Sequence, residues 1–122
     1  MADEITIGAM LAYEKNGVSG CKQRSGLTRD WSGTEHVTLR QSGIGTTAEA
    51  IIAADVAKGG YFFGWNPGTK VLEVRAGTAA DDLIRLEEDD ICLFRVTDDA
   101  TPCVVSTDTG SSGVLSYVWI DP

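Results

Sequence analysis

Residues 61–75 read YFFGWNPGTKVLEVR, which indicates two short strands joined by a tight turn. Aromatic and β-branched side chains fill both ends, and Pro67 and Gly68 interrupt them where the chain can reverse. The same pattern continues along the chain, and turns this short predict antiparallel rather than parallel pairing, in a sandwich or a barrel. The expected strands are 61–66, 70–75, 83–86, 91–96, 102–106 and 114–120.

Alternation of side chains predicts which face of each strand is buried, because successive residues of a strand point to opposite sides. In 114–120, Leu115, Tyr117 and Trp119 share one face, and the opposite face is also largely apolar. We expect one face to pack on the core and the other against a second sheet, a loop or a partner chain. In 91–96, Arg95 marks the outward face.

The first half of the chain is less regular. Residues 5–14 alternate like one long strand, residues 36–40 like a short one, and a loop rich in Gly, Ser, Lys and Arg is expected from Asn16 to Arg29. A capping box at Thr46–Glu49 and apolar residues at helical spacing favour a helix within 46–58. The interpretation is one globular domain, with a strand and arm in 1–30 and a β-sandwich in 31–122.

Length and charge exclude several classes of protein. The 122 residues suit one domain, and no apolar run approaches the roughly 20 residues of a transmembrane helix. No basic leader with an apolar core begins the chain, so we expect synthesis in the cytoplasm rather than secretion. The net charge of −8 makes nucleic acid a poor partner, and no membrane partner is expected.

A small basic window interrupts this acidic chain between Glu14 and Asp30. It is either a solvated surface segment or an arm that docks on an acidic neighbour, including another copy of the same chain. The candidate interface residues are Lys15, Lys22, Arg24, Arg29 and Trp31.

The sequence predicts no catalytic residue, no cofactor and no metal. His36 is the one histidine, without the partners of a triad or a metal site. The acidic quartet at 87–90 is read as a hydrated turn, with a Ca²⁺ site as the alternative. Three cysteines, Cys21, Cys92 and Cys103, fit neither a disulfide framework nor a zinc pair, so free thiols in a reducing cytosol are expected. If 91–96 and 102–106 form a hairpin, Cys92 lies opposite Ser106 rather than Cys103.

Several segments together resemble a known family: Gly60–Asn66, Val71–Val74, Leu83–Leu86, Ile91–Val96 and Val114–Asp121. Their order and spacing are similar to those of the small β-rich virion structural proteins of tailed bacteriophages, with a GxxFxxN strand, a VEV strand, an LFRL hairpin and a terminal LEYxIxD strand. The resemblance covers about residues 37–122. The chain departs from the family at Glu87–Asp90, where small neutral residues are usual.

The resemblance implies an all-β fold, an antiparallel jelly-roll-like β-sandwich of about eight short strands, with 47–53 extended rather than helical. It also implies a virion component, most simply a capsid decoration or cement protein on the outer surface of the head. Its partners would be the major capsid protein and other copies of itself, as a dimer or trimer. The alternatives are a tail, neck or head-fibre component, or a carbohydrate- or receptor-binding module that stacks sugars on aromatic residues. An enzyme acting through His36 is the weakest alternative.

Overall fold

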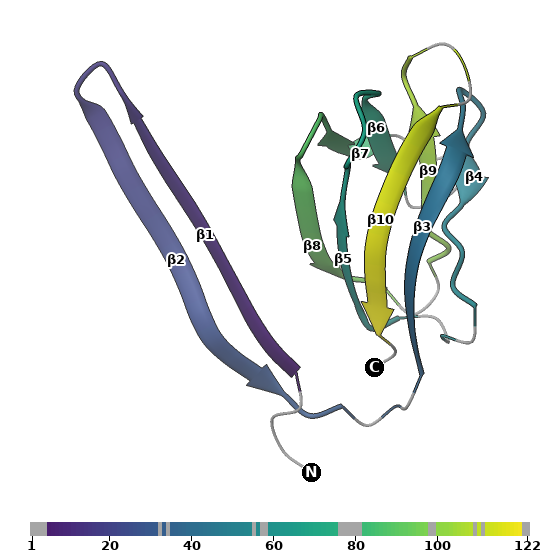
Figure 1. The fold of residues 1–122 in the computed structure, drawn as a ribbon. Coiled ribbons are helices and arrows are strands. Elements are labelled where there is room, and N and C mark those ends of the chain that lie inside the picture. The colour runs from purple at the N-terminus through teal and green to yellow at the C-terminus, as the bar shows by residue number, and fades with distance from the viewer. Residues whose placement is uncertain are drawn as a thin grey trace. The chain divides into compact units, whose positions relative to one another are not determined.

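The computed structural model describes residues 5–31, 33, 35–54, 56, 59–75, 82–97, 100–108, 110 and 112–120. Ten strands form three antiparallel sheets, and no helix occurs in this part of the chain (Figure 1). The chain divides into two compact units, residues 1–32 and residues 33–122. No helix that would be long and apolar enough to cross a bilayer is found among the described residues. Most of the connection expected between the strands 70–75 and 83–86 lies outside the described residues, and so do Asp98 and Asp99.

The first unit is a single β-hairpin of β1 (Ile5–Lys15) and β2 (Val18–Arg29). Its two-residue turn, Asn16 and Gly17, has φ of 51° and 81°, as a type I′ turn requires. The expected strand in 5–14 is therefore confirmed, whereas the expected loop from Asn16 to Arg29 is wrong. That segment pairs along its length with β1, and it lacks apolar alternation because no core covers it.

The second unit is a β-sandwich of two four-stranded sheets, which lie face to face in Figure 1. The first sheet has the order β3 (His36–Ile44), β10 (Gly113–Ile120), β5 (Tyr61–Trp65) and β8 (Ile91–Arg95). The second has the order β4 (Glu49–Ala50), β9 (Cys103–Ser106), β6 (Leu72–Arg75) and β7 (Asp82–Leu86). All pairings are antiparallel, so the all-β sandwich predicted from the sequence is confirmed.

The hairpin considered for 91–96 and 102–106 does not form. β8 pairs with β5 in the first sheet, whereas β9 lies between β4 and β6 in the second. The chain therefore crosses from the first sheet to the second between β8 and β9. All four residues of β9 are buried, as is usual for a strand in the middle of a sheet. The three cysteines are free thiols, as expected.

The described residues of 46–58 are not helical, so the helix favoured by the capping box is wrong. β4 pairs with β9 through Glu49 and Ala50. The amide of Gln41 then donates to the Ala50 carbonyl and accepts from the Ile52 N–H, both at 3.2 Å. Partners elsewhere in the fold thus satisfy backbone groups that a helix would have paired internally.

The core lies between the two sheets, and the face assigned to 114–120 is confirmed. Leu115, Tyr117 and Trp119 are buried, and the ring of Phe62 stacks on Tyr117 with centroids 5.3 Å apart. The buried polar atoms of these aromatic residues have partners, because the Trp119 indole N–H donates to the Gly59 carbonyl at 2.8 Å and the Tyr117 hydroxyl donates to the Ile52 carbonyl. The core cluster draws all its members from residues 37–119.

Asn66 connects two turns at one end of the sandwich, the one that follows β5 and the one between β7 and β8. It is fully buried, and its side-chain amide donates to the carbonyls of Lys70 at 2.7 Å and Leu86 at 2.9 Å. Its side-chain oxygen accepts from the Gly68 N–H at 3.0 Å. Its backbone N–H donates to the Asp90 carbonyl at 3.0 Å, so the acidic turn 87–90 is fixed against this residue.

Candidate interface surfaces

One face of the hairpin combines apolar and cationic side chains. Along β1 the odd-numbered residues share a face, and their partners on β2 lie on the same side of the ladder. Leu27 is opposite Ile7, Arg24 is opposite Ala9, and Lys22 is opposite Leu11. We call this surface the hairpin face. It consists of Ile5, Ile7, Ala9, Leu11, Tyr13, Lys15, Val18, Lys22, Arg24, Leu27 and Arg29, of which Ile5 is buried.

The structure brings four of the five candidate interface residues together on this face. Lys15, Lys22, Arg24 and Arg29 are all exposed, and sequence spacing alone did not reveal that they share a side. The Arg24 guanidinium donates to the Gln23 carbonyl at 3.0 Å and the Arg29 guanidinium donates to the Thr28 carbonyl at 2.8 Å, and both side chains are exposed. The fifth residue, Trp31, lies after the last hairpin pair and is half-buried.

The hairpin leaves large apolar side chains in water. Leu11 is 68% exposed and Tyr13 is 56% exposed, although the Tyr13 ring covers the space where a Cβ of Gly20 would stand. Met10, on the opposite face, is 64% exposed. An isolated two-stranded hairpin is marginal in water. These features indicate a segment that is stabilised by contact with something else.

The outward face of the first sheet is a second apolar surface. Its cross-strand rows are set by the register, in which Val118 pairs with Phe63 and Phe63 with Leu93. We call this surface the outer sheet face. Its apolar members are Tyr61, Phe63, Trp65, Ile91, Leu93, Val118 and Ile120, and Arg40, Ser116 and Arg95 lie in the same cross-strand rows. The Phe63 and Trp65 ring centroids are 5.7 Å apart.

The outer sheet face is open to solvent. Ile91 is 67% exposed and Leu93 38% exposed, so no part of the second sheet covers them. A second sheet is therefore excluded as a cover for Ile91 and Leu93. The Arg95 guanidinium stands 5.5 Å from the Tyr61 ring centroid at one end, and the acidic turn 87–90 adjoins Ile91 at the other.

Charge is divided unequally between the two units. Residues 33–122 carry six basic and fourteen acidic side chains, which accounts for the whole net charge of −8. Residues 1–32 carry four basic and four acidic side chains and are neutral overall, and within them residues 5–29 hold the four cations of the hairpin face and one acid, Glu14. The hairpin is therefore a cationic segment on an acidic protein, and its natural complement is an acidic surface.

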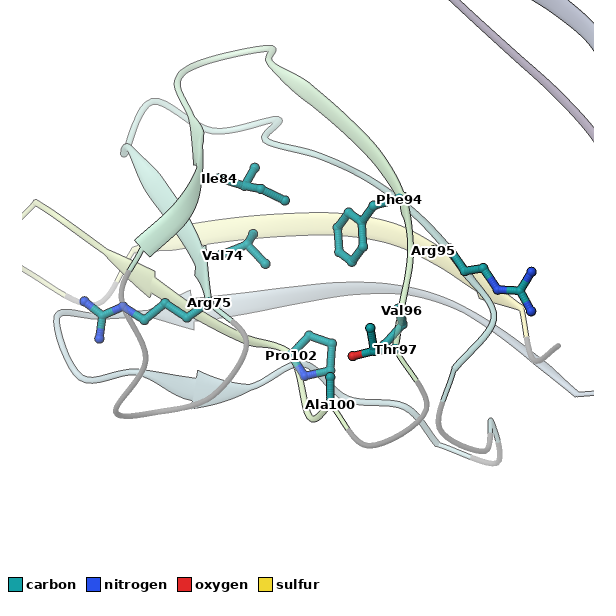
Figure 2. Close-up of a pocket in the computed structure, with 9 residues that line it drawn as sticks. All are labelled: Val74, Arg75, Ile84, Phe94, Arg95, Val96, Thr97, Ala100 and Pro102. Atoms are coloured by element: carbon teal, nitrogen blue, oxygen red, sulfur yellow. The ribbon is translucent and has the colours of Figure 1, made fainter.

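An apolar cavity of about 300 Å³ opens between the two sheets (Figure 2). Val74 and Ile84 line it from the second sheet, and Phe94 and Val96 line it from the first. The side chains of Arg75 and Arg95, at its margin, point away from it in Figure 2. The described residues that line it present mainly hydrocarbon, which suits packing of an apolar group.

The buried titratable groups are held in their neutral forms. Burial raises the pKa of the Cys92 thiol to about 11 and also raises the pKa of Cys103. Burial likewise raises the pKa of Tyr117 to about 12. His36 is exposed at the start of β3, and among the described residues no group of three or more His, Cys, Asp and Glu is arranged to hold a metal ion.

The acidic turn 87–90 is shaped by its own carboxylates. The Asp90 carboxylate accepts from the Glu87 N–H at 2.9 Å, and the Asp90 N–H donates to the Glu87 carbonyl at 3.0 Å. Glu87 also pairs with Arg85 at 3.3 Å. Two of the four carboxylates thus have partners within the turn and its strand, which accords with the hydrated turn expected there.

Comparisons of the chain with protein-family models, with curated proteins and with solved structures gave no match. Function is therefore inferred from this chain's own surfaces. The hairpin face and the outer sheet face are the two places where large apolar side chains meet solvent along whole strands.

Proposed function

We propose that this chain is a capsid decoration, or cement, protein of a tailed bacteriophage, which binds the outer surface of the head and stabilises contacts between major capsid protein subunits. The observation that carries the proposal is the hairpin of residues 5–29, which exposes apolar and cationic side chains and has no core of its own. The kind of particle is suggested by the resemblance of residues 37–122 to virion structural proteins.

The physics of a virus head favours such a part. A shell under internal pressure gains from many symmetric copies of a small protein, because many weak contacts add up to firm attachment. The acidic unit of residues 33–122 is repelled by packaged DNA, which keeps it on the outside. The hairpin supplies the contact, and its four cations select an acidic surface on a coat subunit or a neighbouring copy.

Sedimentation of the purified protein with empty heads tests attachment. The informative variant is Lys22→Gln/Arg24→Gln, which removes two charges from the hairpin face, and the matched control is Arg40→Gln/Arg85→Gln, which removes two exposed charges from the sandwich. We expect weaker binding for the hairpin variant and for the wild type as salt rises toward about 0.5 M, because exposed charges are screened. Equal binding by both double variants would refute a role for the hairpin cations.

A chain lacking residues 1–32 gives a second test. It keeps every residue of the core cluster, so we expect it to fold and to lose most of its head binding. Tight decoration by the truncated chain would show that the hairpin is not the attachment device. Binding confined to one ring of the particle, rather than spread over the shell, would favour a neck or tail component instead.

The outer sheet face also favours a second candidate function, a carbohydrate-binding module. Tyr61, Phe63 and Trp65 follow one another along the outward side of β5, and sugars stack on aromatic rings presented in this way. Glycan-array binding that is lost in Trp65→Ala and kept in Trp31→Ala would support that function. Firm head binding with no glycan bound would dismiss it.

A further inference from the structure

We propose that the hairpin of one copy packs its hairpin face onto the outer sheet face of a second copy, and that the second copy reciprocates. The inference rests on the proposed function for its setting, an assembly of identical chains. Its test uses purified protein without heads, so the two proposals can fail separately.

The two surfaces match in kind and in length. Both are regular β-surfaces with apolar side chains along them, and each lacks a cover within its own unit. The apolar stretch from Ile7 to Tyr13 spans about 20 Å at the usual rise along a strand. The five-residue strands β5 and β8, which carry most of the outer sheet face, span about 17 Å by the same measure. The hairpin therefore covers the outer sheet face along its full length.

Charge selects the hairpin of a second copy over its sandwich. Two sandwich units of the same net charge, −8 each, repel when their outer sheet faces approach. A hairpin brings three net positive charges over residues 5–29 instead. The exposed carboxylates of Glu88 and Asp89 lie in the turn that leads into Ile91, at one end of the outer sheet face. In the proposed contact they can pair with Arg24 or Arg29 of the second copy.

Area favours reciprocal exchange over a single contact. The contact is limited by the length of the outer sheet face, because a two-stranded ribbon about 10 Å wide that lies along about 17 Å covers about 170 Å², well below the roughly 600 Å² per partner of the smaller stable interfaces. Reciprocal exchange adds a second identical contact and doubles the covered area of each partner.

The test is the oligomeric state of the full chain by sedimentation velocity over a dilution series. Leu11→Asp puts a charge on the hairpin face, and its control Met10→Asp puts the same charge on the adjacent, equally exposed residue of the opposite face. Leu93→Asp puts a charge on the outer sheet face, and Ile52→Asp, exposed elsewhere on the sandwich, is its control. Near-ultraviolet circular dichroism verifies that each variant is folded.

We expect a dimer for the wild type, at least a tenfold weaker dimer (about 1.4 kcal/mol) for Leu11→Asp and for Leu93→Asp, and changes of no more than about twofold for the controls. An equimolar mixture of Leu11→Asp and Leu93→Asp regains one intact contact, so its dimer is tighter than that of either variant alone. A monomeric wild type would overturn the proposal in favour of docking within one chain. A Leu11→Asp variant that dimerises like the wild type would overturn it in favour of pairing between sandwich faces. Dimerisation as expected without head binding would refute the proposed function alone.

Discussion

Replacing Asn66 by alanine removes three hydrogen bonds at once and is expected to destabilise the sandwich severely. The bond to the Leu86 carbonyl is buried, and its loss is expected to cost about 2 kcal/mol, because a buried acceptor loses a donor. The part-buried bonds to the Lys70 carbonyl and from the Gly68 N–H cost about 1 kcal/mol each. The expected loss is therefore about 4 kcal/mol, a large share of the 5–15 kcal/mol that typical domains possess.

Urea unfolding followed by tryptophan fluorescence measures this loss. The matched control is Thr69→Ala, an exposed residue of the same turn, whose effect should stay within about 0.5 kcal/mol. For a unit of this size the Asn66→Ala variant should also melt about 15 to 30 °C lower. A loss below about 1 kcal/mol would refute the reasoning, because it would mean that the two turns hold together without the side chain that joins them.

Three further predictions follow from the same structure. The free energy of unfolding should fall as pH rises from about 9 toward 11, because the Cys92 thiol ionises at lower pH in the unfolded chain than in the folded one. A Cys92→Ala variant should lose less stability over that range, which urea titrations at alkaline pH will measure. A thiol reagent at neutral pH should modify Cys21 alone until denaturant exposes Cys92 and Cys103; rapid labelling of all three in native buffer would contradict their burial. Gly17→Val should open the hairpin, since its φ of 81° suits glycine and strains a β-branched residue by about 1–2 kcal/mol; retained cross-strand nuclear Overhauser contacts between Lys15 and Val18 would show otherwise.

The strands of the sandwich were predictable because each carries its own alternation. Leu115, Tyr117 and Trp119 point inward as the spacing indicates, and Arg95 points outward. The partners of those strands were not predictable in the same way. β8 and β9 are neighbours in sequence and lie in different sheets, a choice made by long-range packing rather than by the residues between them.

The sequence carries a turn signal for the hairpin, but the polar residues that follow it indicate a loop. Asn16-Gly17 is the dipeptide most typical of a type I′ turn, and it follows a long alternating strand. The residues after it, polar and rich in glycine, indicate a loop when judged by hydrophobic pattern alone. Such a pattern reports burial against a core, and a strand that has none within its own unit does not display it.

Within 46–58 the local signals favour a helix, but tertiary partners override them and the described residues are not helical, which agrees with the extended segment that the resemblance implies. Thr46–Glu49 has the residues of a capping box, yet Gln41 and Pro102 take up the backbone groups of Ala50, Ile51 and Ile52. Of the candidate interface, the four cations were identified from composition. Their common face and the outer sheet face needed the register of the strands.

The place of β10 in its sheet has a consequence for synthesis. β10 is paired on one side with β3 and on the other with β5, so the first sheet stays in separate pieces until residue 120 has emerged from the ribosome. Until then, the side chains of Phe62 and Val37, which are buried in the folded protein, lack part of their packing partners. The first sheet can therefore form only once β10 is available, and its long-range topology sets a slow pace of folding.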